Sequence, residues 1–365
     1  MRRLFFISAA VALIALLLGL TAQAQSLDDA LNAVDTSQLQ AVGDEAGFDV
    51  GATLKGLASG EIRLDAKEAL EEAGRIARER LSAAGAWMLA LCLPSIALAI
   101  LKRLTGDGPA ARAAGTVCYL SAAAVLVGLA VRSIGQARQA VDLTVKLCDA
   151  LFPAMTALLA ATGRAATAAA LSPAASLMGG LLGWAIENLI LPLLACCAAL
   201  IVAGNLSESV KLGGMTGLIA GLCKWTLGLC STVLMGVLSV QGLLGSGQDG
   251  ASIRTAKYAV DSLLPIIGGD VGDALELVGA NAQLIKSAIG ATGLMLLLAL
   301  TAGPIIELAG VMFLTRLAAA VTEPIETGRA QKMMAQFSEV LGLMVASVAT
   351  AALIALLVTG AMLRL

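Results

Sequence analysis

The chain has 365 residues, of which 58% are hydrophobic, 14% charged and 3% aromatic, and its formal net charge is −2. Soluble domains carry about 25% charged residues, so this composition argues against a soluble globule, whose surface it could not cover with polar groups. The lack of a basic excess argues against a nucleic-acid partner. The sequence contains no histidine, which excludes Ser-His-Asp and Cys-His catalysis and histidine-ligated zinc or haem.

The seven cysteines form no C-x-x-C pair, and most lie inside apolar runs. In such surroundings cysteine behaves as a small hydrophobe. We therefore expect these residues to pack, and we expect no disulfide framework, metal site or other cofactor. No nucleophile–base pair stands out either, so we do not expect an enzyme.

Residues 1–24 have the layout of a secretory signal peptide. Arg2 and Arg3 precede an apolar core, Leu4–Leu20, and the small-x-small sequence AQA ends at Ala24. We predict cleavage after Ala24. The alternative is an uncleaved anchor helix, because the apolar core is long for a signal. Both alternatives place the next segment outside the cytoplasm.

Residues 25–83 form the one sizeable stretch suited to water. Within it Leu64–Leu81 puts apolar residues on one helical stripe, with acids leading and arginines following, as the helix dipole favours. This pattern predicts an extracytoplasmic amphipathic helix. It could lie on the bilayer surface or pack on the membrane domain.

Residues 84–365 are predicted to be an all-α, polytopic bundle of membrane helices. A span needs about 20 mostly apolar residues. The candidates are Ala84–Leu101, Gly115–Val131, Leu177–Ala203, Met215–Leu244, Ile289–Leu314 and Val340–Leu363. A seventh candidate, Leu147–Leu171, is interrupted by Pro153. The richness in Gly and Ala favours close packing of helices in lipid.

Two of these spans contain an acid, Glu187 in one and Glu307 in another. A carboxylate inside a membrane is expensive, so by default it is a functional candidate. The alternative is that each acid lies near enough to an interface to reach water. Glu307 is the deeper of the two in its span.

An internal repeat links two segments between the spans. CDALFPAM, Cys148–Met155, resembles VDSLLPII, Val260–Ile267: Asp149 aligns with Asp261 and Pro153 with Pro265. A second similarity joins NLSESVK with EPIETGR, and Ile186-Glu187 aligns with Ile306-Glu307 after a small gap. Repeated helix units build many transport folds. Chance similarity in Ala/Leu-rich sequence is the alternative.

The repeat predicts three helical hairpins joined by two half-polar connectors, residues 133–175 and 245–288. We expect the second to contain a broken or re-entrant element with Gly268-Gly269 as its bend and with Asp270 among the acids facing water or a polar pathway. Two short helices on the bilayer surface are the alternative. Six spans put both connectors outside and the hairpin turns in the cytoplasm. A seventh span would reverse everything after it.

An ordered string of motifs runs through the second half of the chain. It includes NLSESVKL, KWTLGL, GVLSVQG, IRTAKYAVDSLLPIIGG and RLAAAVTEPI. This string resembles the stage III sporulation protein AE family of endospore-forming bacteria. The similarity is strongest from Leu177 to Ile325.

The resemblance implies a multi-pass protein of the mother-cell membrane that surrounds the forespore. It implies one component of a channel between the two cells, needed for late forespore development. The implied partners are other stage III sporulation membrane proteins, a secretion-type ATPase and a forespore membrane protein. It carries over no catalytic residue. Two functions stay open, a permease-like conducting subunit and a scaffold that recruits ring and ATPase components without conducting.

Overall fold

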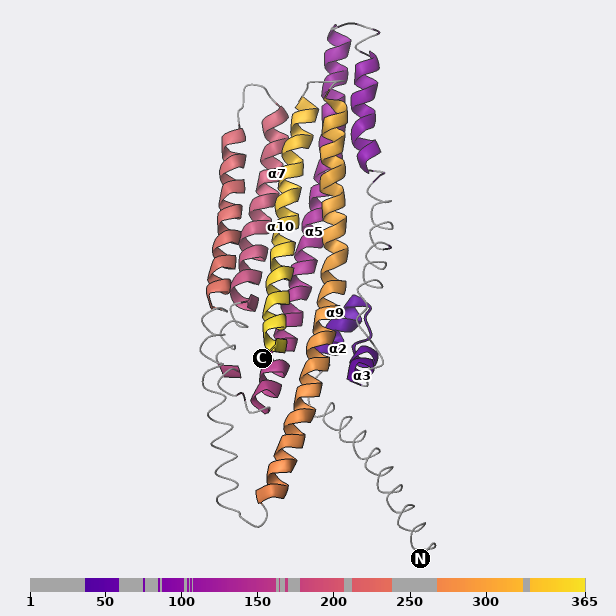
Figure 1. Ribbon diagram of the computed structural model, residues 1–365. Helices are drawn as coiled ribbons and strands as arrows, with labels where there is room; N and C mark the ends of the chain where they lie inside the picture. The colour runs from indigo at the N-terminus through magenta and orange to yellow at the C-terminus, as the bar shows by residue number, and fades with distance from the viewer. Residues whose placement is uncertain are drawn as a thin grey trace, which may run out of the picture.

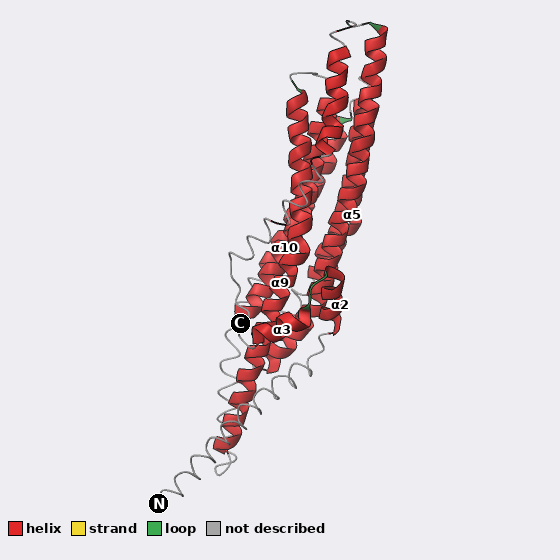
Figure 2. Ribbon diagram, turned by 90° about the vertical axis from the view of Figure 1, so that its right-hand side faces the viewer, coloured by secondary structure: helices red, strands yellow, loops and turns green. Residues whose placement is uncertain are grey.

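The computed structural model describes residues 37–58, 87–101, 108–161, 178–206, 212–237, 268–323 and 329–364, with positions 75, 85, 104, 106, 164, 168 and 169 between them. This part of the chain is helical and contains no strand (Figure 2). The predicted signal peptide lies outside the described residues. So does the predicted helix Leu64–Leu81, apart from Arg75.

Five of the described helices are long and apolar enough to cross a membrane, and a sixth is shorter. In chain order they are the short helix Trp87–Leu101, α5 (Pro109–Ala161), the continuous helix 178–206, the helix Gly213–Val237, α9 (Gly268–Thr322) and α10 (Arg329–Arg364). Each overlaps one of the six predicted spans. The prediction of an all-helical bundle suited to a membrane is confirmed, whereas the number of spans stays a prediction.

Helices that follow one another in the chain run antiparallel (Figure 1). Close contacts show the direction for α5 and α9: a methyl group at Gly293 of α9 would lie 2.6 Å from Leu151 of α5, and Glu307, further along α9, bonds Arg132, which precedes Leu151 on α5. The three pairs of consecutive helix ends therefore meet at one end of the bundle: Leu101 with Pro109, Leu206 with Gly213, and Thr322 with Arg329. The ends that lead into the two connectors lie toward the other end.

Helix α5 extends through most of the predicted first connector. We expected a break after Val131, but the helix continues without interruption to Ala161 and passes through Pro153. The physical reason is a buried stripe with helical spacing, formed by Ser133, Ala137, Ala140, Val141, Thr144, Leu147, Leu151 and Met155. Residues 147–161 are thus the last part of α5 and not a helix of their own.

Helix α9 likewise begins inside the predicted second connector. Gly268 and Gly269 are its first two residues, and the backbone continues as one helix to Thr322. We expected a bend at this pair followed by a separate span. Instead, residues 268–288 are continuous with the membrane helix, and the residues before Gly268 lie outside the described part.

The helix 178–206 contains two π-helical segments, η1 (Met178–Gly183) and η2 (Ile186–Ile190), before α7 (Leu191–Leu206). The backbone N–H of Leu191 bonds the carbonyl of Ile186, five residues back. Pro192 follows directly, and proline lacks an N–H and crowds the carbonyl four residues earlier. A local widening of the helix accommodates it, and Glu187 lies within the widened turn.

Two short helices, α2 (Ser37–Ala46) and α3 (Val50–Ala58), pack on α5 and α9. Gly47 adopts a positive φ of 69° and ends α2, with the Phe48 N–H bonded to Gly43 O at 2.8 Å. Asp49 then caps α3 by accepting a 2.9 Å bond from the Ala52 N–H. The tight turn lets both helices place apolar residues against the bundle.

Candidate functional site

An ion pair joins the middle of α5 to α9. The Arg132 guanidinium donates to Oε1 of Glu307 at 2.8 Å, and the two residues are 175 positions apart in the sequence. The Glu307 side chain is 6% exposed, whereas that of Arg132 is 49% exposed. The sequence left two alternatives for Glu307: a functional residue, or one close enough to an interface to reach water. In the structure Glu307 is the buried partner in an ion pair between two helices.

This ion pair lies at the depth of the apolar part of α10. A methyl group at Gly342 of α10 would lie 3.3 Å from Met312 of α9, and the position of Gly290 on α9 faces Leu363. Glu307 lies between these two levels on α9, so its neighbours on α10 come from residues 340–363, which contain no charged residue. The pair is therefore at membrane depth.

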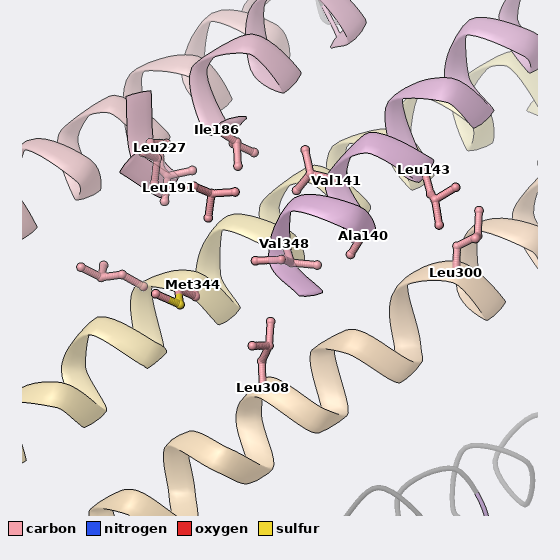
Figure 3. Close-up of a cluster of buried hydrophobic side chains, with 14 of the residues drawn as sticks. Ala140, Val141, Leu143, Ile186, Leu191, Leu227, Leu300, Leu308, Met344 and Val348 are labelled. Carbon is pink, nitrogen blue, oxygen red and sulfur yellow. The ribbon is translucent and has the colours of Figure 1, made fainter. Parts of the chain in front are cut away.

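Apolar side chains fill the space between the helices at this depth (Figure 3). They come from α5, α9, α10, the helix 178–206 and the helix Gly213–Val237, and include Val141, Leu308, Val348, Ile186 and Leu227. The outer face of α5 is different, because it carries charges at the same depth as this apolar core.

The charged row of α5 consists of Arg132, Arg138, Asp142, Lys146 and Asp149. At 3.6 residues per turn, these positions fall within about 120° of the helix surface. The side chain of Asp142 is 45% exposed and that of Lys146 48% exposed, and they bond each other at 2.8 Å. Exposing such groups to hydrocarbon costs about 2.5–3.5 kcal/mol for each residue at the helix centre. The row therefore favours water or a polar partner over lipid.

Glu187 extends the charged row onto the neighbouring helix. Its carboxylate is partly buried, and the charges of Asp142, Arg138 and Lys146 act on it. It lies in the π-helical segment η2, and such segments occur frequently at functional sites. Both acids predicted within spans thus face α5 from different helices.

Helix α2 reaches the same row from the N-terminal segment. Glu45 Oε2 lies 3.8 Å from Lys146 Nζ, and both side chains are about half exposed. This long contact is weak by itself. It shows that the segment before the bundle lies beside the charged row.

The predicted pathway residues have separate locations. Asp149 belongs to the charged row, and Pro153 lies exposed one turn further along α5. Asp261 and Pro265 lie outside the described residues. Gly268, Gly269 and Asp270 are the first three residues of α9, and nothing is described of the Asp270 side chain. The proposed likeness of the two connectors therefore stays a prediction.

Sequence reasoning alone does not group Arg132, Arg138, Asp142 and Lys146 into one site. It places this stretch in a connector, where helical spacing has no meaning. The spacing of four residues from Arg138 to Asp142 to Lys146 is nevertheless a visible signal of a common helix face.

Most of the cysteines are packed among other side chains, whereas Cys196 is exposed and Cys118 is partly buried. All seven lie in described helices, none is disulfide-bonded, and five are buried. Among the residues that the structure describes, no group of three or more Cys, Asp or Glu side chains is placed to hold a metal ion.

Residues 48–364 match the family model for stage III sporulation protein AE, a range that includes α3 and all six apolar helices. The chain belongs to this family. Stage III sporulation protein AE of Bacillus subtilis (strain 168) is 28% identical over 245 residues, which cover 66% of this chain and 60% of that relative. The match therefore spans about three fifths of the relative's length. No solved structure matches the chain.

Membership confirms the family predicted from the motif string and assigns the chain to sporulation. Together with five apolar helices, it describes a multi-pass membrane protein. The charged row and Glu307 therefore belong to a membrane protein with a role in sporulation.

Proposed function

We propose that this family member is a conducting, permease-like subunit of the apparatus that links mother cell and forespore. In this proposal it lies in the mother-cell membrane around the forespore. It acts there with other stage III sporulation membrane proteins, a secretion-type ATPase and a forespore membrane partner. The charged row of α5 lines one side of the conducting route.

The charged row at membrane depth is the observation that supports conduction. Its three positive and two negative side chains follow one helix face beside an uncharged stretch of α10. Ionisable residues inside a membrane typically face a water-filled cavity or a protein partner. A route lined by both signs of charge would suit small polar solutes better than apolar ones.

Water access to the row provides the direct test. Single cysteines replace Arg138 and Asp142 in a chain whose native cysteines have been changed to serine or alanine, and cells are treated with a membrane-impermeant thiol reagent. Leu353→Cys on α10 is the matched control, because Leu353 is 55% exposed and lies in the uncharged stretch. We expect labelling at positions 138 and 142 and none at 353.

A second arm of the test measures function with charge reversal. We expect Asp149→Lys and Asp261→Lys to block expression of a late forespore reporter while protein abundance is unchanged. Wild-type sporulation in both variants, with unlabelled cysteines in the row, would refute conduction. The scaffold would then be favoured if only changes in the hairpin turns or the N-terminal segment prevented capture of the partner proteins.

A further inference from the structure

Helix α9 buries a second charged side chain, Lys286, about six helical turns from Glu307. Lys286 is 0% exposed, and its Nζ has no hydrogen-bond partner in the described structure. Burying an ammonium group without a partner is costly, and buried charges in proteins are normally paired. Lys286 therefore needs a negative charge that does not come from the described part of the chain.

Lys286 lies at one boundary of the apolar layer. Gly290, one turn further along α9, packs against Leu363 of α10 and Met155 of α5. Leu363 is the last residue of the uncharged stretch of α10. Helical side chains lean toward the N-terminus of their helix, which for Lys286 is the direction away from the centre of the layer.

A second cation lies near Lys286. Arg164 lies just beyond the end of α5: its N–H bonds Leu159 O and its carbonyl accepts from the Ala168 N–H, both at 3.0 Å. Its charge acts on Lys286, and the two cations repel each other. Neither forms an ion pair with an acid in the described part of the chain. Arg164 is partly exposed, so an anion approaching this end of the bundle meets it first.

We propose that Arg164 and Lys286 form a binding site for the phosphate group of an anionic phospholipid. The phosphate would supply the missing negative charge, and basic pockets between membrane helices bind anionic headgroups in this way. A lipid is favoured over a soluble anion because Lys286, one turn from Gly290, lies at the boundary of the apolar layer, where phospholipid headgroups lie. This site does not depend on the proposed conduction.

The test uses the full chain in vesicles of phosphatidylcholine alone or mixed with phosphatidylglycerol. Bound lipid is measured by mass spectrometry after extraction in mild detergent, and Tm is measured in both vesicle types. We expect the wild-type chain to retain phosphatidylglycerol selectively and to melt at a higher temperature in its presence. Lys286→Met should weaken retention about fivefold, because one basic residue contributes that much to anionic-lipid binding.

Lys224→Met is the matched control, because Lys224 is an exposed lysine on the helix Gly213–Val237. It should retain phosphatidylglycerol as the wild type does. Arg164→Gln changes a partly exposed residue and should also reduce retention, so it decides the question if Lys286→Met does not fold.

Equal retention by the wild type, Lys286→Met and Arg164→Gln would overturn the proposal. So would an equal rise in Tm produced by inorganic phosphate in phosphatidylcholine vesicles, because the ligand would then be a soluble anion. Loss of lipid selectivity with normal thiol labelling of the charged row would support the lipid site independently of conduction.

Discussion

Helix α5 contacts its two neighbouring hairpins in different ways. Toward α9 it forms an ion pair in which Glu307 is buried and Arg132 is half exposed, and it approaches so closely that a methyl group at Gly293 would lie 2.6 Å from Leu151. Toward the helix 178–206 the Tyr119 hydroxyl donates to the Val202 carbonyl, and Glu187 faces several charges at once. The contact of α5 with α9 thus consists of one ion pair and tight packing. Its contact with the helix 178–206 is more polar, and Glu187 there is partly exposed.

The difference concerns two acids that the predicted internal repeat aligns. Glu187 and Glu307 occupy aligned positions in the sequence, and both adjoin α5 in the structure. Only Glu307 is buried in a direct ion pair. The two acids therefore both adjoin α5, but one is held in an ion pair and the other is partly exposed.

Breaking the ion pair should have the largest effect. We expect Arg132→Leu to destabilise the chain toward the lower end of the ~3–5 kcal/mol typical of broken buried pairs, because Arg132 is itself half exposed. Denaturant unfolding of the purified chain in mixed micelles measures the loss. The double variant Arg132→Leu/Glu307→Leu should recover most of it, since no charge is left to bury. A double variant as unstable as Arg132→Leu alone would contradict this account.

Filling the close approach of α5 and α9 should have an intermediate effect. A methyl group at Gly293 would meet Leu151 at 2.6 Å, so Gly293→Ala should cost about 1–3 kcal/mol by overpacking. Gly303→Ala on the same helix is the control, because an added methyl group there would meet no neighbouring side chain within 4 Å. The control should be as stable as the wild type or up to about 1 kcal/mol more stable. Equal effects at both positions would show that the helices are not in close contact.

Neutralising the second acid should have the smallest effect on stability. Glu187 is partly exposed and faces both signs of charge, so Glu187→Gln should change the free energy of unfolding by less than about 1 kcal/mol. The same unfolding experiment measures it. A loss as large as that of Arg132→Leu would mean that the two sides of α5 are equivalent after all, and it would sharpen the case for a functional repeat.

Most helix positions could be predicted from the sequence because hydrophobic content is a local property. The predicted span Val340–Leu363 lies entirely within α10, and Gly115–Val131 lies within α5. The sequence did not predict that α5 and α9 extend into the connectors, and the reason is the same for both helices. Charged residues were interpreted as the end of a span, whereas a helix can continue past them with its apolar stripe turned inward.

The candidate site could be predicted only in part. Glu187, Glu307 and Asp149 were singled out because an acid in an apolar context is costly wherever it lies. Their partners on α5 were not, because Arg132 and Glu307 are far apart in the chain. No local pattern states which distant side chain will neutralise a buried charge.

The sequence by itself determined that this is a helical membrane protein of the sporulation family, since apolar runs and ordered motifs are properties of the chain alone. The tertiary structure decided that Glu307 is paired, that Lys286 is buried beside another cation, and that one face of α5 is charged at membrane depth. The physical reason is that burial and electrostatic energy depend on distances between residues from different helices, and packing alone sets those distances.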